Sequence, residues 1–61
     1  MANLTEKELS ALEDQLSLEQ MLVKKYKGYA GIAQDPQIRD MCNRLAQQHK
    51  QHFDTLMGHL Q

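Results

Sequence analysis

The sequence has little of what stabilises most small domains. Among its 61 residues is one cysteine, so no disulfide can form within a single copy. A chain of this length makes one domain, because it cannot hold two cores and buries only roughly 60% of the surface of its unfolded form. Such a domain usually gains stability from a second copy of the chain or from a metal ion.

Other absences exclude whole classes of protein. Seven Lys and Arg stand against eight Asp and Glu, and nucleic-acid-binding proteins usually carry a basic excess. No stretch approaches the ~20 apolar residues of a membrane span. The opening "MANLTEKELS" has no apolar run of the kind found in a secretory signal. These absences predict a cytoplasmic protein with neither a nucleic-acid nor a membrane partner. No Ser–His–Asp set, Gly-rich phosphate loop or CxxC pair is present.

The single proline marks the one break in a helical pattern. Pro36 suits the first position of a helix, where no backbone N–H is needed, and Asp35 before it is a good N-cap. Proline also disfavours the helical conformation for the residue that precedes it. These residues predict that a helix ends near residue 33 and that another spans about 36–60.

The beginning of the first helix also carries a recognisable signal. Thr5 followed three residues later by Glu8 is a capping-box pattern, which predicts a helix over about 5–33. The connection is then only about two residues long, so the two helices should fold back antiparallel. The expected fold is all-α: one helical-hairpin domain over residues 1–61.

Both predicted helices carry a stripe of residues whose spacing alternates between three and four. This spacing is typical of helices that pack in bundles. The stripe of the first helix consists of Leu9, Leu12, Leu16, Glu19, Val23, Tyr26, Ala30 and Ala33. The stripe of the second consists of Ile38, Cys42, Leu45, His49, His52, Leu56 and His59. Each stripe is apolar except near its middle and at the end of the second helix.

The polar interruptions of the two stripes fall at the same height. With the turn near residues 34 and 35, Glu19 faces position 50, between His49 and His52. A carboxylate in a core stripe is costly unless it is paired or binds a metal. Two histidines and a carboxylate suit Fe(II), Zn or Mn. Two interpretations remain open: a divalent metal site, or a buried Glu–His network that only fixes helix register.

Two other stripe residues have reactive side chains but are interpreted as packing residues. Tyr26 lies one heptad beyond Glu19 and is a natural core aromatic. Cys42 lies two turns from His49, roughly 10 Å along the helix axis, which is too far to share an ion with it. We therefore predict a buried cysteine that behaves as a small apolar residue.

The apolar surface is wider than one hairpin can cover. Leu18, Leu22, Met41 and Phe53 flank the stripes and leave apolar area beyond the reach of a single partner helix. We therefore predict a homodimer that forms a four-helix bundle. In such a dimer both Glu–His–His sets lie at mid-height and line one central cavity.

The chain resembles the two-helix module of the spore coat protein F family, a ferritin-like group of endospore-forming bacteria. The resemblance covers Leu4 to Leu60. It is carried by "LTEKELSALEDQLSLEQ", "KKYKGYA", "DPQIRD" and "QQHKQH", in that order, followed by two spaced leucines. It implies a ferritin-like bundle, a spore-coat setting and spore coat proteins as partners.

The same resemblance bears on the site. Ferritin-like proteins place a Glu on one helix and a Glu-x-x-His motif on the next. Glu19 matches the first, His52 matches the histidine of the motif, and His49 stands where the motif has Glu. The resemblance thus implies a metal site with one bridging carboxylate fewer per hairpin. It leaves open whether the protein is a metal-dependent oxidoreductase or a non-enzymatic structural module.

Overall fold

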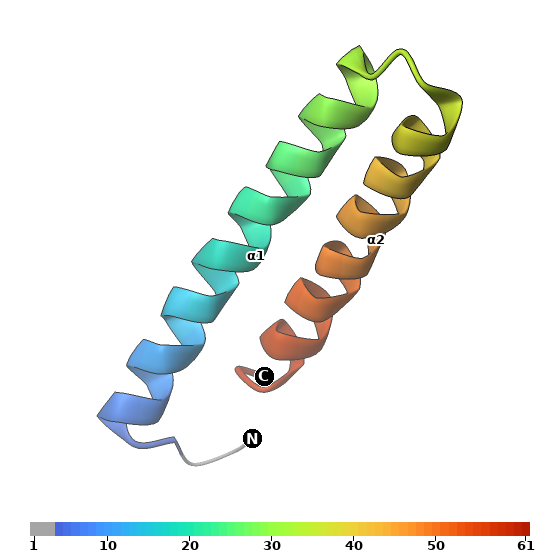
Figure 1. Ribbon diagram of the computed structural model, residues 1–61. Helices are drawn as coiled ribbons and strands as arrows, with labels where there is room; N and C mark the ends of the chain where they lie inside the picture. Colours follow the sequence, from blue (N-terminus) through green and yellow to red (C-terminus); the bar gives the residue numbers. More distant parts are fainter. Residues whose placement is uncertain (1–3) are drawn as a thin grey trace.

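The computed structural model describes residues 4–61, which form two helices joined by a short turn (Figure 1). Helix α1 spans Glu6–Ile32 and helix α2 spans Pro36–Gly58. The two run antiparallel, side by side, in a rod of 46 × 15 × 11 Å. The described residues contain no strand, so the predicted all-α hairpin is confirmed. Residues 1–3 of the expected domain lie outside the described part of the chain.

The capping box at the beginning of α1 forms as predicted. The Thr5 hydroxyl accepts a hydrogen bond from the Glu8 backbone N–H at 3.1 Å, and the Glu8 carboxylate accepts one from the Thr5 N–H at 3.0 Å. Each side chain satisfies a backbone donor that the first turn leaves without a helical partner. The hydrogen bond from the Thr5 backbone lowers the pKa of Glu8 below its ordinary value.

The turn between the helices is held by side chains on both sides. The Asp35 carboxylate accepts a hydrogen bond from the Gln37 N–H at 2.8 Å, and Pro36 occupies the first turn of α2. From that helix the Arg39 Nε donates to the carbonyl oxygen of Ala33 at 3.3 Å. This contact ties the end of α1 to the beginning of α2 and fixes where the two helices meet.

Removing the cap of α2 is expected to destabilise the fold measurably. Asp35→Ala loses an N-cap that is typically worth about 1 kcal/mol, which lowers the melting temperature of so small a domain by roughly 4–8 °C. Asp40→Ala removes the same charge from the same helix without removing a cap. Circular dichroism melts at one protein concentration should separate the two variants. Equal melting temperatures would contradict the capping role of Asp35.

Helix α2 ends slightly earlier than the sequence indicated. Its last helical residue is Gly58, whereas the predicted helix continued to about Leu60. The N–H groups of His59 and Leu60 bond to the carbonyl oxygens of Leu56 and Met57, three residues back, at 3.1 and 3.0 Å. The final turn therefore tightens, as helix ends commonly do, after a glycine that is a poor helix former.

The inward face of α1 agrees with the predicted stripe. Leu16, Glu19 and Ala30 are its buried residues, and each lies on that stripe. Leu9 belongs to the stripe but is exposed, because it lies near the open end of the hairpin. The rotation of α1 about its axis was therefore predicted correctly over most of its length.

The inward face of α2 is turned relative to the prediction. Cys42 is buried as expected, but the most buried residue of the hairpin is Ala46, which was not on the stripe. Three stripe members lie exposed: Ile38, His52 and His59. The physical reason is packing, since the small Ala46 side chain fits between the helices and Phe53 turns partly inward.

Candidate metal centre

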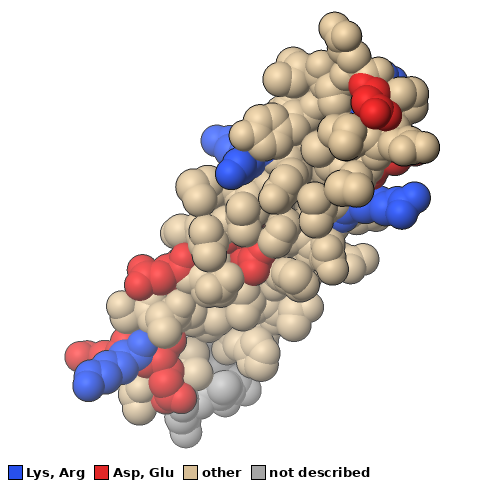
Figure 2. Space-filling model, in the orientation of Figure 1, with Lys and Arg blue, Asp and Glu red and all other residues tan. Residues whose placement is uncertain are grey.

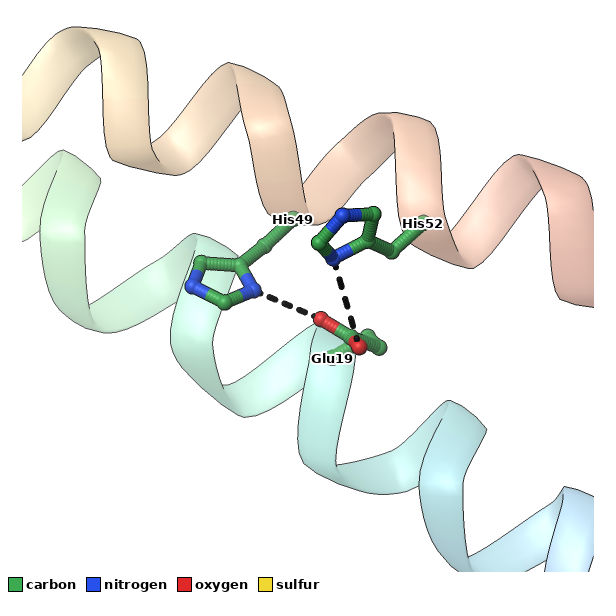
Figure 3. Close-up of side chains that lie close together, drawn as sticks. All are labelled: Glu19, His49 and His52. Atoms are coloured by element: carbon green, nitrogen blue, oxygen red, sulfur yellow. Dashed lines mark hydrogen bonds and ion pairs between the residues drawn. The ribbon is translucent and has the colours of Figure 1, made fainter.

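Three polar side chains meet halfway along the hairpin (Figure 3). Glu19 projects from the middle of α1 toward α2, where His49 and His52 lie one helical turn apart. Residues three apart on a helix are neighbours on its surface, so both rings can turn toward one carboxylate. The structure thus brings together all three residues that the sequence singled out.

Both imidazoles direct the same type of nitrogen at Glu19. His49 Nδ1 lies 2.7 Å from Glu19 Oε1, and His52 Nδ1 lies 3.6 Å from Glu19 Oε2 (Figure 3). The first distance is a short hydrogen bond, while the second is too long for one. An ionised carboxylate only accepts hydrogen bonds, so the hydrogen of His49 lies on Nδ1. His52 stands close to the carboxylate without being hydrogen-bonded to it.

The three side chains differ strongly in burial. Glu19 is 6% exposed, whereas the side chains of His49 and His52 are 19% and 52% exposed. The Glu19 carboxylate therefore lies between the helices. The imidazole of His49 covers it, and the imidazole of His52 lies at the solvent-exposed edge of the cluster. The sequence placed both histidines on the inward stripe. His49 is half-buried there, whereas His52 is exposed because of the rotation of α2 described above.

Two neighbouring side chains hold the cluster in place. Gln15, one turn before Glu19 on α1, donates from its amide Nε2 to Glu19 Oε2 at 3.0 Å. The ring of Tyr26 stacks on the imidazole of His49, with centroids 5.8 Å apart and planes 5° apart. Tyr26 was expected only as a core aromatic, and Gln15 was not expected at all. Both orient groups that would bind a metal.

The pKa of the Glu19 carboxyl lies below its ordinary value of 4.5. The largest cause is the hydrogen bond from His49, which favours the ionised form. Burial acts in the opposite direction, while Gln15 and the charges on the two histidines lower the pKa further. The carboxylate is therefore ionised at neutral pH, which is the form that binds metal ions.

This lowered pKa predicts a dependence of stability on pH. An acid with a depressed pKa stabilises the fold fully above its unfolded value, and this contribution is lost as pH falls through the folded value. The melting temperature of metal-free protein should therefore fall as the pH drops below ~5 and through the lowered pKa of Glu19, and the melting temperature of Glu19→Gln should fall less steeply. Both proteins keep the Glu8 carboxylate, whose lowered pKa therefore affects the two pH profiles equally. Parallel profiles would contradict the contribution of Glu19.

The donor set fits a divalent transition metal. The potential ligand atoms of Glu19, His49 and His52 all lie within 4.8 Å of one another. Two ligands each about 2.1 Å from a tetrahedral ion are about 3.4 Å apart. The observed separations are 2.7 Å from His49 Nδ1 to one Glu19 oxygen and 3.6 Å from His52 Nδ1 to the other, so the side chains would have to rearrange to hold one ion. A metal ion bound to His49 Nδ1 would replace the hydrogen through which this nitrogen now bonds to Glu19.

Three protein ligands leave coordination positions open. A structural Zn site normally has four protein ligands, whereas two histidines and one carboxylate leave room for water, substrate or further ligands. In this hairpin the open side is that of His52, the most exposed of the three side chains. Anything that completes the coordination would therefore come from that side.

Comparison with protein-family models, with curated proteins and with solved structures found no match. The resemblance to the spore coat protein F family therefore stays a prediction. No helix within residues 4–61 is long and apolar enough to cross a membrane.

Proposed function

We propose that this protein binds a divalent metal ion, Fe(II), Zn or Mn, through Glu19, His49 and His52. The observation that supports this most strongly is the meeting of a 6% exposed carboxylate with two imidazoles from the facing helix. A lone carboxylate between helices would be costly, and this one is surrounded by groups that metal sites use. Gln15 and Tyr26 supply the supporting contacts that such sites need.

We further propose that a second copy of the chain completes the site. The hairpin exposes 4945 Å² of surface, whereas a compact monomer of 7.1 kDa exposes about 4,100 Å². The chain therefore exposes more surface than a compact protein of its mass, and pairing with a second copy, which typically buries ~800 Å² per partner, would cover part of the excess. Pairing two hairpins into a four-helix bundle would bring the surface close to that of a compact protein.

The face with His52 is the one suited to this pairing. Leu18 and Leu22 on α1, and Met41 on α2, lie on the same side of the hairpin as His52, by the 100° rotation per residue of a helix. Leu18 is 41% exposed and Met41 is 57% exposed. Figure 2 shows a broad face whose charged side chains lie mainly at its edges and ends. An uncharged surface of this kind favours burial against an identical copy.

Two hairpins paired through this face would gather six ligands. Two Glu19, two His49 and two His52 can hold one six-coordinate ion, or two ions with bridging glutamates. Two carboxylates balance the charge of one divalent ion, whereas two ions would need added anions. The arrangement is ferritin-like in kind. A spore-coat setting with coat-protein partners, and any redox activity, are what the family resemblance adds to this proposal, whereas a cytoplasmic setting is the expectation drawn from the sequence itself.

A second candidate function is a structural module without metal, and one observation favours it. Among the described residues no buried side-chain nitrogen or oxygen lacks a hydrogen-bond partner. The Glu19–His49–Gln15 network is thus satisfied without an ion and could serve only to fix how α1 and α2 align. In that case Glu19→Leu would leave the fold intact or stabilise it, as replacing buried polar groups sometimes does.

Elemental analysis of protein purified without a histidine tag tests the metal proposal. We expect about half an ion or about one ion per chain, depending on whether the dimer holds one or two ions. His52→Ala should lose the metal, whereas His59→Ala, which removes an exposed histidine outside the site, should retain it. Metal-free wild-type protein that binds none of the three ions on dialysis would refute the proposal.

A further inference from the structure

A hollow lies between the helices at the height of the proposed metal centre, on the side of the hairpin opposite His52. It is lined by Gln20, Val23 and Lys24 from α1 and by Lys50 and Phe53 from α2, with a volume of about 350 Å³. Ligand pockets typically have volumes of ~300–1,000 Å³. The hollow is therefore large enough for a small molecule, and neither histidine of the metal centre lines it.

This groove opens on the side of the hairpin opposite His52. Each residue is rotated by about 100° around the helix axis from the one before it. A residue three positions further along is rotated by about 300°, so it lies about 60° from the first residue in the opposite direction. Lys50 therefore lies to one side of His49 and His52 lies to the other. On α1 the same rule separates Gln20 from Leu18. The face proposed for dimerisation and the groove are thus different surfaces, and the groove stays open in the dimer.

The lining of the groove combines an apolar floor with cationic walls. Val23 and Phe53 are half-buried, so the floor offers apolar contact without being filled by the hairpin itself. Lys24 on α1 and Lys50 on α2 are exposed and line the groove, one from each helix. Two like charges disfavour a second copy of the chain on this face and favour an anion.

We propose that this groove binds an anionic amphiphile: a carboxylate on an unbranched apolar chain. The chain lies over Val23 and Phe53, and the carboxylate lies between the ammonium groups of Lys24 and Lys50. A purely inorganic anion would leave the floor in water, and an uncharged hydrocarbon would make no ion pair with either lysine. The combination therefore selects a ligand that has both parts.

One feature of the free protein limits the affinity of the groove. Lys50 Nζ donates to both carboxylate oxygens of Asp54, at 2.8 and 3.0 Å, one turn further along α2. Both side chains are 58% exposed, and exposed pairs of this kind are weak enough to exchange readily. Asp54 nevertheless competes with the ligand for Lys50. Removing that competitor should strengthen binding, an effect that damage to the fold cannot imitate.

The probe is decanoate, titrated into isotopically labelled wild-type protein and followed by two-dimensional NMR at ~0.15 M salt. Charges further apart than the ~8 Å screening length then interact little. We expect saturable shifts concentrated on the five lining residues. Decanol, which has the same chain without the charge, should bind at least about fivefold more weakly.

Charge variants test which groups carry the recognition. Lys24→Glu should abolish saturable binding, whereas Lys25→Glu, with the same change in net charge, should leave it within about twofold. Lys25 is a suitable control because its Nζ lies 6.0 Å from the centre of the Tyr29 ring, outside the groove. Asp54→Asn should tighten binding by about two- to fivefold, the size of one exposed ion pair.

The proposal is overturned if decanoate produces no saturable shifts, or if decanol binds as tightly as decanoate. It is also overturned if the shifts centre on Leu18, Leu22 and Met41, which would place the chain on the other face. If Lys24→Glu and Lys25→Glu weaken binding equally, decanoate is attracted only by the net charge of the protein, and the proposal is overturned. None of these outcomes depends on whether Glu19, His49 and His52 bind a metal.

Discussion

Excess Zn, Mn or Fe(II) is expected to raise the melting temperature of the wild-type protein by roughly 10–20 °C. An ion that binds only the folded state stabilises it by about 2.7 kcal/mol at a hundred times its dissociation constant. In a domain of this size each kcal/mol shifts the melting temperature by about 4–8 °C. The measurement is a circular dichroism melt with chelator and with each metal, at one protein concentration.

Variants of the proposed ligands decide whether that gain comes from the proposed site. Glu19→Ala removes the carboxylate and His52→Ala removes the more exposed imidazole, and each should abolish the metal-dependent rise in melting temperature. His59→Ala removes a histidine that lies near the end of α2, and it should keep the rise in full. A rise of the same size in Glu19→Ala would place the metal elsewhere, and no rise in the wild type would leave only the structural interpretation.

Cobalt(II) adds a readout that is independent of stability. Its visible absorption reports whether nitrogen and oxygen ligands bind directly and in what geometry, so a mere surface interaction would not reproduce it. Tyr26→Phe keeps the ring that stacks on His49, whereas Tyr26→Leu removes it. If stacking orients His49, only the Leu variant should weaken cobalt binding, by about tenfold or more.

The height of the site along the hairpin could be predicted from the sequence, because it depends on few quantities. The rise per residue of a helix is fixed at about 1.5 Å, and the cap at Asp35 with Pro36 fixed the turn. Counting outward from the turn placed Glu19 opposite position 50, and the observed hydrogen bond joins it to His49. No knowledge of packing was needed for that step.

The rotation of α2 could not be predicted, because it depends on side-chain volume. A three–four spacing fits two neighbouring phases of α2, one through Leu45 and His52 and one through Ala46 and Phe53. Packing favours the second phase, in which the small Ala46 is only 3% exposed between the helices. His52 was therefore predicted at the correct height but too far inward.

The sequence carried only a weak signal for the role of Gln15, namely its position four residues before Glu19 on the same helix. Several glutamines lie on these two helices, and Gln15 differs from the others only in being one turn before Glu19. Its importance comes from the amide reaching Glu19 Oε2 at 3.0 Å, which depends on the rotamers of both side chains. Supporting contacts of this kind follow from packing around a site rather than from residue spacing.

Leu18→Asp is expected to convert the proposed dimer into monomers. In the hairpin alone Leu18 is 41% exposed, so an aspartate there costs a monomer little. In the dimer each copy would bury the 41% of Leu18 that is still exposed, which is worth about 0.6–1.2 kcal/mol when a whole buried leucine is worth about 1.5–3 kcal/mol. Because both copies lose this contribution and each would also bury a charge, the dimer should weaken by at least about tenfold. Analytical ultracentrifugation over a range of concentrations measures the change directly.

The neighbouring Ser17 provides the matched control. Ser17→Asp introduces the same charge one residue away on α1, but about 100° round the helix and away from α2, where no partner is expected. It should sediment as the wild type does. If both variants and the wild type are folded monomers, the second copy plays no part. If Leu18→Asp alone dissociates and also loses most of the metal-dependent rise in melting temperature, the partner contributes ligands to the site, because Leu18 itself cannot bind the ion.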